Sequence, residues 1–76
     1  MTTYTIKFPQ ALEIKKIIKI FNNFAQIKDN KIIFENNEMV FKINDNHTEC
    51  VIFSAKDNSR FLYKLKHYFS FCKIDY

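Results

Sequence analysis

The chain has 76 residues, a net charge of +4 and no glycine. This length corresponds to one small domain, and the absence of glycine excludes the glycine-rich loops that bind phosphate. Two cysteines are too few for a disulfide framework or a zinc site, and no run approaches the roughly 20 apolar residues of a membrane span. We therefore expect a cytoplasmic protein with free thiols, no cofactor and no membrane association, whose positive charge favours an anionic partner.

The N-terminal third of the chain predicts a strand followed by a helix. Residues 2–8 alternate between large apolar and polar side chains, which is the pattern of a strand with one buried face. Pro9 ends this strand. Residues 11–24 carry isoleucine and phenylalanine at the i, i+3, i+4, i+7 spacing of an amphipathic helix, with lysine and asparagine on the remaining surface.

Three further strands and a second helix are expected in the rest of the chain. The expected strands are residues 31–35, 39–44 and 50–56, and residues 25–28 are compatible with one more short strand. Residues 45–47 form the hairpin loop between the last two strands. Asp57, Asn58 and Ser59 are three candidate N-caps for a helix whose apolar positions run from Phe61 to Cys72.

The expected fold is α+β, in the order strand, helix, three strands, helix. Each helix has one apolar stripe and the small, mostly antiparallel sheet has one apolar face. Both helices therefore cover the same face of the sheet. The opposite face, which we call the open face, is then left to solvent.

We expect the open face to be the functional surface. Because side chains alternate across a strand, parity assigns polar side chains and two aliphatic ones to it. The predicted binding residues are Thr5, Lys7, Lys42, Asn44, Cys50, Ile52, Ser54 and Lys56, and Val40 points the same way. Amines, amides and hydroxyls together suit phosphate and sugar contacts, which position a nucleic acid without reading its sequence. A solvated sheet face with no ligand fits the same pattern.

No catalytic site is evident, so we expect that this chain by itself is not an enzyme. The carboxylates lie mostly at turns or strand ends, and no pair has the helical spacing of a metal site. His47 and Cys50 invite a Cys/His nucleophile, but no third orienting group accompanies them. A loop histidine beside an ordinary strand cysteine is the simpler interpretation.

Three stretches of the chain are similar to a known family. Residues 1–6 with the first amphipathic helix look like the start of bacterial ribonuclease HIII. Residues 40–44, the hairpin and residues 51–56 resemble the strand, the hairpin and the Val-Leu-Phe-Gln-Gly-Lys strand of that family. The helix that follows Lys56 also matches in position. The resemblance covers nearly the whole chain and corresponds to the N-terminal domain of that family alone, which is similar to one repeat of the TATA-box-binding protein.

This resemblance implies a substrate-binding module for an RNA/DNA hybrid or another nucleic acid. In the family, the N-terminal domain grips the hybrid through its open sheet face, and the catalytic carboxylates belong to a following domain. By position, the resemblance places Asn44, Ile52, Ser54 and Lys56 on the binding strands. Residues 48–50 depart from the usual Ser-Gly-Lys of the family hairpin, because both the glycine and the lysine are lost. The chain would then be an excised domain or one that has lost its catalytic half.

A second function fits the same residues. Small chains rich in asparagine, lysine and isoleucine, without catalytic groups, also suit a protein-interaction module, such as an inhibitor encoded by a phage or mobile element. An apolar patch around Val40 and Ile52, or a free edge strand, would then be the interaction surface.

Overall fold

The computed structural model describes residues 1–76 and confirms the predicted α+β architecture. The elements are β1 (Thr2–Lys7), α1 (Ile14–Phe21), β2 (Gln26–Lys28), β3 (Lys31–Phe34), β4 (Asn37–Ile43), β5 (Glu49–Ser54), α2 (Ser59–Tyr68) and β6 (Lys73–Asp75). The predicted order is therefore kept, and the short strand at β2 is present. β6 is an addition that the sequence pattern did not predict. Neither helix is long and apolar enough to cross a membrane.

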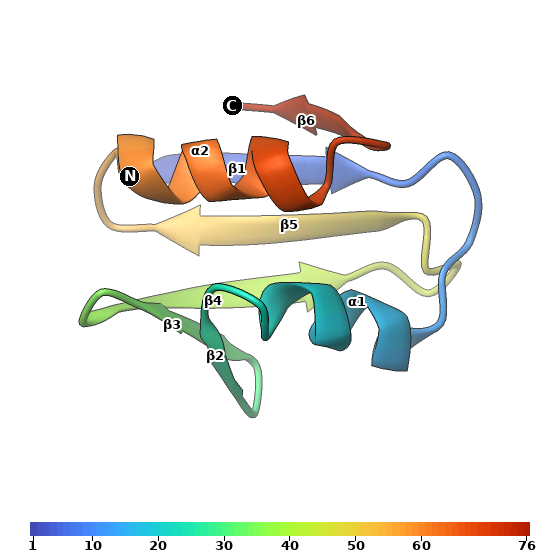
Figure 1. Ribbon diagram of the computed structural model, residues 1–76, viewed down its shortest axis with the longest axis horizontal. Helices are drawn as coiled ribbons and strands as arrows, with labels where there is room; N and C mark the ends of the chain where they lie inside the picture. Colours follow the sequence, from blue (N-terminus) through green and yellow to red (C-terminus); the bar gives the residue numbers. More distant parts are fainter.

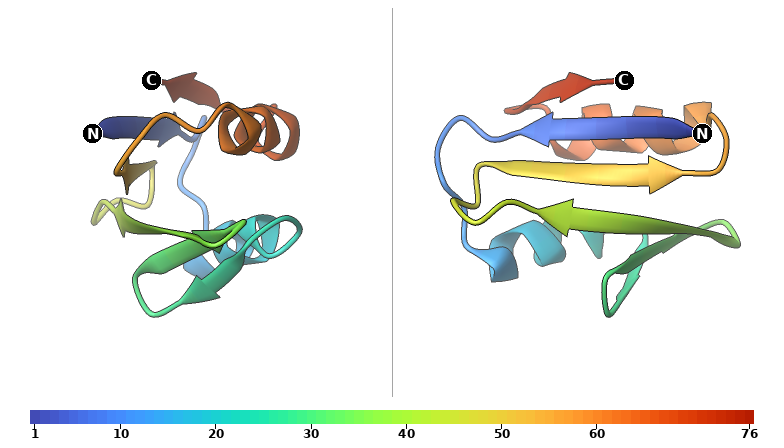
Figure 2. Two further views of the ribbon diagram at one scale, coloured as in Figure 1. Left: turned by 90° about the vertical axis from the view of Figure 1, so that its left-hand side faces the viewer. Right: turned by 180° about the vertical axis from the view of Figure 1, so that it is seen from behind.

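The six strands form one antiparallel sheet in the order β2-β3-β4-β5-β1-β6. Both helices lie on the same side of this sheet, and the view from behind shows the uncovered side (Figures 1 and 2). The connection through α1 carries the chain from β1 to the far edge of the sheet. The β2–β3 hairpin turns out of the plane of the central strands toward the helices (Figure 2). The predicted two-layer arrangement with one open face is confirmed.

Tight turns are made without glycine. Asp29, Glu35, Asn36 and His47 adopt positive φ angles of 58°, 48°, 68° and 55°. Glu35 and Asn36 are consecutive and link β3 directly to β4, which matches the two-residue hairpin turn that needs positive φ at both positions. The carboxylate of Glu35 is paired with the guanidinium of Arg60 at 2.7 Å, so this turn is tied to α2.

α1 is shorter than the predicted helix over residues 11–24. Its N-cap, Glu13, has the extended angles φ −66° and ψ 143°. The backbone N–H of Leu12 donates to the carbonyl of His47 at 3.0 Å, which ties the connection before α1 to the β4–β5 loop.

The core between sheet and helices is built around aromatic rings. Phe21 of α1, with no exposed surface, lies 4.9 Å from Phe69 at the end of α2, measured between ring centroids. Phe24 stacks on Tyr68 at 5.0 Å. The two helices therefore meet through these rings.

The start of α2 is fixed by Asn58, one of the three predicted N-caps. Its Oδ1 accepts a hydrogen bond from the backbone N–H of Phe61 at 3.1 Å. Its own backbone N–H donates to the hydroxyl of Tyr4 at 2.9 Å. This second bond anchors the N-terminus of α2 to the buried side of β1.

The assignment of faces to β5 from sequence parity is wrong. β5 pairs with β1 in the register Tyr4↔Ile52 and Ile6↔Cys50. Partners directly opposite each other share a face, and Tyr4 and Ile6 are buried against the helices. Cys50 and Ile52 therefore lie in the core with no exposed surface, and Ser54 is only 5% exposed.

The error has a physical cause in the composition of β5. Residues 50–53 are four consecutive apolar side chains, so their polarity does not distinguish a buried from an open face. A one-residue change of parity moves every side chain of a strand to the other face. The pairing with β1, whose faces differ clearly in polarity, decides the orientation.

Candidate functional site

The open face is a grid of side chains from all six strands. Its members, in strand order from β2 to β6, are Gln26, Lys28, Lys31, Ile33, Glu38, Val40, Lys42, Glu49, Val51, Phe53, Thr3, Thr5, Lys7, Lys73 and Asp75. Neighbours in the grid come from segments far apart in the chain. The pairing register, rather than sequence proximity, therefore determines which groups could touch one ligand.

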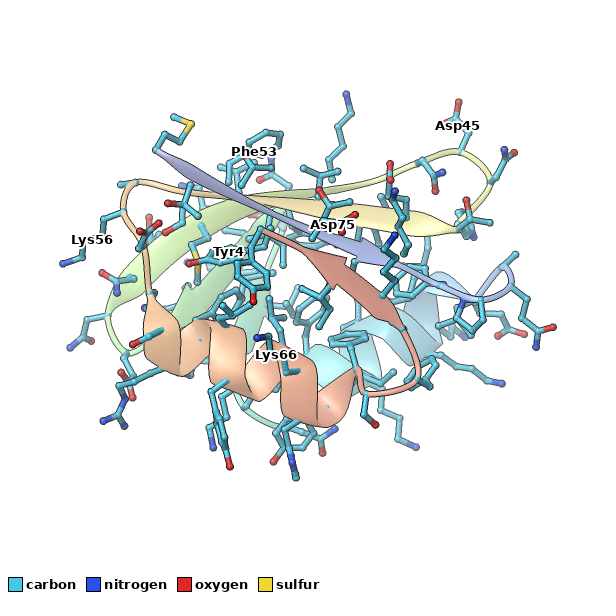
Figure 3. The ribbon with its side chains drawn as sticks, turned by 90° about the horizontal axis from the view of Figure 1, so that it is seen from above. Tyr4, Asp45, Phe53, Lys56, Lys66 and Asp75 are labelled. Atoms are coloured by element: carbon cyan, nitrogen blue, oxygen red, sulfur yellow. The ribbon has the colours of Figure 1, made fainter.

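Apolar side chains occupy the centre of the open face. Phe53 on β5 is directly opposite Val40 on β4 and Thr3 on β1. Phe53 is 39% exposed and Val40 is 42% exposed. Figure 3 shows Phe53 on the side of the sheet away from α2, whereas Tyr4 lies on the side that faces it. Phe53 and Val40 therefore form a small exposed apolar centre in the middle of the open face.

Lysines are distributed over the open face, and most of them lack a carboxylate partner. Lys7 pairs with Asp75 at 3.4 Å and Lys31 with Glu38 at 3.6 Å, both between half-exposed side chains. Lys28, Lys42 and Lys73 form no ion pair, so their ammonium groups are available to an anion. The open face thus carries five lysines against three acids.

Charge alone does not single out the open face. The chain has twelve lysine and arginine residues, and those outside the open face lie on the helices or in the loop before α2. Exposed aromatic side chains also occur elsewhere, at Tyr63, Phe71 and Tyr76. On the open face, Phe53 and Val40 are directly opposite each other, with Lys31 opposite Val40 and Lys42 two residues along β4 from it.

Three predicted binding residues lie on the open face. Thr5, Lys7 and Lys42 have the predicted orientation, as does Val40. Thr5 is opposite Val51, which in turn is opposite Lys42, so the hydroxyl and the amine lie two strands apart across one apolar residue.

Asn44 and Lys56 lie beyond the ends of their strands. The Oδ1 of Asn44 accepts from the backbone N–H groups of Thr48 at 2.8 Å and Glu49 at 3.0 Å, and its Nδ2 donates to the Thr48 hydroxyl at 2.9 Å. Asn44 therefore closes the β4–β5 loop with both of its polar atoms. Lys56 is exposed in the bend between β5 and α2, outside the grid of paired strands (Figure 3).

Cys50, Ile52 and Ser54 lie inside the protein, so their predicted place on the open face is corrected. The first two pack in the core described above. The Ser54 hydroxyl donates to the carbonyl of Lys56 at 2.6 Å, which stabilises the bend after β5. Because all three side chains are covered by the helices, none can contact a ligand on the open face.

The Cys/His constellation does not form an activated nucleophile. Burial raises the pKa of the Cys50 thiol from 9.0 to about 12, which disfavours the reactive thiolate. His47 is held in the β4–β5 loop by a hydrogen bond from its backbone N–H to the carbonyl of Asn44. Burial also raises the pKa of Cys72, to about 11.

The raised pKa of Cys50 predicts a loss of stability at high pH. The folded thiol keeps its proton up to about pH 12, whereas the unfolded thiol loses it near pH 9.0. The free energy of unfolding is therefore unaffected by this thiol below pH 9. Above pH 9 it declines by about 1.4 kcal/mol per pH unit at most, because only the unfolded state releases the thiol proton. Urea denaturation at pH 8 and pH 10 should show a larger decrease for the wild type than for Cys50→Ala. Equal decreases in the two proteins would refute this role.

The sequence interpretation missed Phe53 and Val51 as surface residues. Because it put Cys50, Ile52 and Ser54 on the open face, strand parity left Val51 and Phe53 to the covered one. A usable signal was nevertheless present, since residues 3–7 alternate unambiguously. An antiparallel pairing of β5 with that strand would have transferred the correct faces to β5.

A comparison with known protein families found no matching family model, and searches of curated proteins and of solved structures found no match either.

Proposed function

We propose that the open face binds nucleic acid, with an RNA/DNA hybrid as the ligand class that the resemblance to ribonuclease HIII implies. The observation that supports this proposal is the pairing of an exposed aromatic and aliphatic centre, Phe53 and Val40, with lysines that lack carboxylate partners. Lysines attract and position phosphates, and apolar groups pack against sugars and bases.

The proposed contacts follow from the grid. Lys42 and Lys28 bind phosphate oxygens. Lys31 binds a third phosphate when its ion pair with Glu38 is replaced by a contact with the ligand. The hydroxyls of Thr3 and Thr5 donate to sugar or phosphate oxygens beside Phe53. With about three phosphates neutralised, the logarithm of the binding constant should fall by about 2 to 3 per logarithmic unit of salt on a duplex. The affinity of the domain alone is accordingly weak.

Reversing the charge at Lys42 tests the proposal. Lys42→Glu should weaken binding of a hybrid duplex and lower the slope of the salt dependence by about 1, because one phosphate contact is removed. Lys16→Glu is the matched control, since Lys16 is an exposed lysine of α1 on the opposite side of the molecule. Fluorescence anisotropy at two salt concentrations measures both quantities. Equal losses in the two variants would indicate unspecific attraction to a basic protein, and salt-independent binding would contradict the proposal.

A protein-interaction module is the second candidate, and the exposure of Val40 and Phe53 is the observation that favours it. On this alternative, the apolar centre of the open face meets an apolar surface of another protein or of a second copy. Size-exclusion chromatography tests this candidate by measuring self-association. Self-association would favour a protein partner over nucleic acid if Phe53→Asp abolishes it and salt does not weaken it.

A further inference from the structure

We infer that the nucleic acid on the open face presents an unpaired base to Phe53, so that its ligand includes a single-stranded segment, either alone or as a tail beside a hybrid. This inference rests on the proposed function and makes it more specific. It concerns the class of nucleic acid, and it assigns to Phe53 a task that lysines cannot perform.

The accessibility of Phe53 supports a stacking role. Its cross-strand neighbours on the open face are Thr3 and Val40, two small β-branched side chains, and Phe53 is 39% exposed. Neighbouring side chains of this kind form a low surface around the ring, on which a flat group can rest. Stacking of a base on an aromatic side chain is tolerant of sequence, because every base has a π-face.

Base pairing decides which nucleic acids can use this ring. In a duplex, the faces of the bases are covered by their neighbours, and only base edges are accessible in the grooves. A base must leave the stack before it can lie on an aromatic side chain. Phe53 therefore selects a single strand, or a single-stranded tail beside a hybrid, over a blunt duplex.

The lysines lie where the backbone of such a strand would pass. Lys42 is diagonal to Phe53, because its partner Val51 precedes Phe53 by two residues on β5. Lys31 is opposite Val40 and thus two strands from Phe53, about 10 Å away at the usual strand spacing. Both amines are within reach of phosphates adjoining a base stacked on the ring.

Charge and size favour this occupant over a protein. A stable protein interface covers about 800 Å² on each partner. Only Phe53 and Val40 among the apolar side chains of the open face are exposed rather than half-buried, and they are bordered by Lys42 and by the ion pair of Lys31 with Glu38. A small apolar centre beside lysine amines is complementary to a base flanked by phosphates, provided that a phosphate replaces Glu38 at Lys31.

Substitution of Phe53 tests the inference by anisotropy titration. The probes are a labelled single strand of mixed sequence, a blunt hybrid, and the same hybrid with a single-stranded tail. Phe53→Leu should weaken binding of the single strand and the tailed hybrid by roughly 5- to 150-fold, which corresponds to loss of one base stack. Phe53→Tyr should keep the affinity, and the blunt hybrid should be insensitive. Phe71→Leu is the matched control, because Phe71 is 50% exposed in the connection between α2 and β6.

The outcomes separate this inference from the proposed function. If Phe53→Leu costs no more than Phe71→Leu while Lys42→Glu still weakens binding, the stacking role is wrong and nucleic-acid binding by the open face stands. If Phe53→Leu weakens blunt and tailed hybrids equally, the ring contacts a groove and selection of unpaired bases is wrong. If no probe binds, or if Lys42→Glu has no effect, both are overturned. Circular dichroism of each variant confirms that it is folded.

Discussion

Ile52→Asp should unfold the domain, whereas Phe53→Asp at the next position should leave it folded. Ile52 has no exposed surface and packs between the sheet and the helices, while Phe53 is 39% exposed on the open face. Removing a buried isoleucine side chain costs about 2–5 kcal/mol, and a buried, unpaired carboxylate adds several more. A domain of this size is stable by only about 4–11 kcal/mol, so the sum is comparable with the whole stability.

The same change at Phe53 has a smaller expected effect. Phe53→Asp removes the contacts of a partly exposed aromatic side chain and introduces a residue with poor strand propensity. The free energy of unfolding should therefore fall by about 1–2 kcal/mol. Circular dichroism and urea denaturation of the two variants provide the measurement. If Phe53→Asp were the unfolded protein and Ile52→Asp the folded one, the faces of β5 would be the reverse of those described here.

Phe21→Ala should be the most destabilising truncation of an α1 side chain, at about 3–5 kcal/mol. Phe21 has no exposed surface, and its ring lies 4.9 Å from Phe69, 5.9 Å from Phe24 and 6.2 Å from Phe41. These rings come from the sheet and from both helical segments. Their contacts with Phe21 would be lost together and a cavity would remain.

Equilibrium urea unfolding measures this loss directly. Phe71→Ala is the matched control, because the side chain of Phe71 is half exposed and should contribute less than about 1 kcal/mol. A similar loss of stability in the two variants would show that Phe21 is not the centre of the core. The milder Phe21→Leu keeps most of the volume and should fall between the wild type and Phe21→Ala.

The local elements could be predicted wherever the two sides of a segment differ in polarity. β1 alternates between buried Tyr4 and Ile6 and open Thr3, Thr5 and Lys7, so both its type and its faces follow from local sequence. The apolar stripe of α2 follows from spacing in the same way, whereas its N-cap, Asn58, was one of three candidates among which only the structure decided. β6 was missed because three residues are too few to show a period, and its pairing with β1 depends on the tertiary structure.

The candidate site was predictable only in part. Lys42 was placed correctly because β4 keeps polar and apolar sides, whereas Ile52 was placed on the wrong face because its neighbours are apolar as well. The ion pairs that engage Lys7 and Lys31 join different strands, so they too could not be read from the chain. Asn44 was assigned to a ligand, although hydrogen bonds to Thr48 and Glu49 occupy its side chain.

The sequence by itself determined the α+β class, the helices, most of the strands, and the existence of a sheet face without helices. These features follow from the periodic alternation of polar and apolar side chains, which can be seen within each segment alone. Only the tertiary structure decided which side of β5 faces the helices, and therefore that Phe53 rather than Ile52 is exposed on the open face. The reason is that a strand of consecutive apolar residues acquires its faces from its neighbours, through the hydrogen-bonded register with β1 and β4.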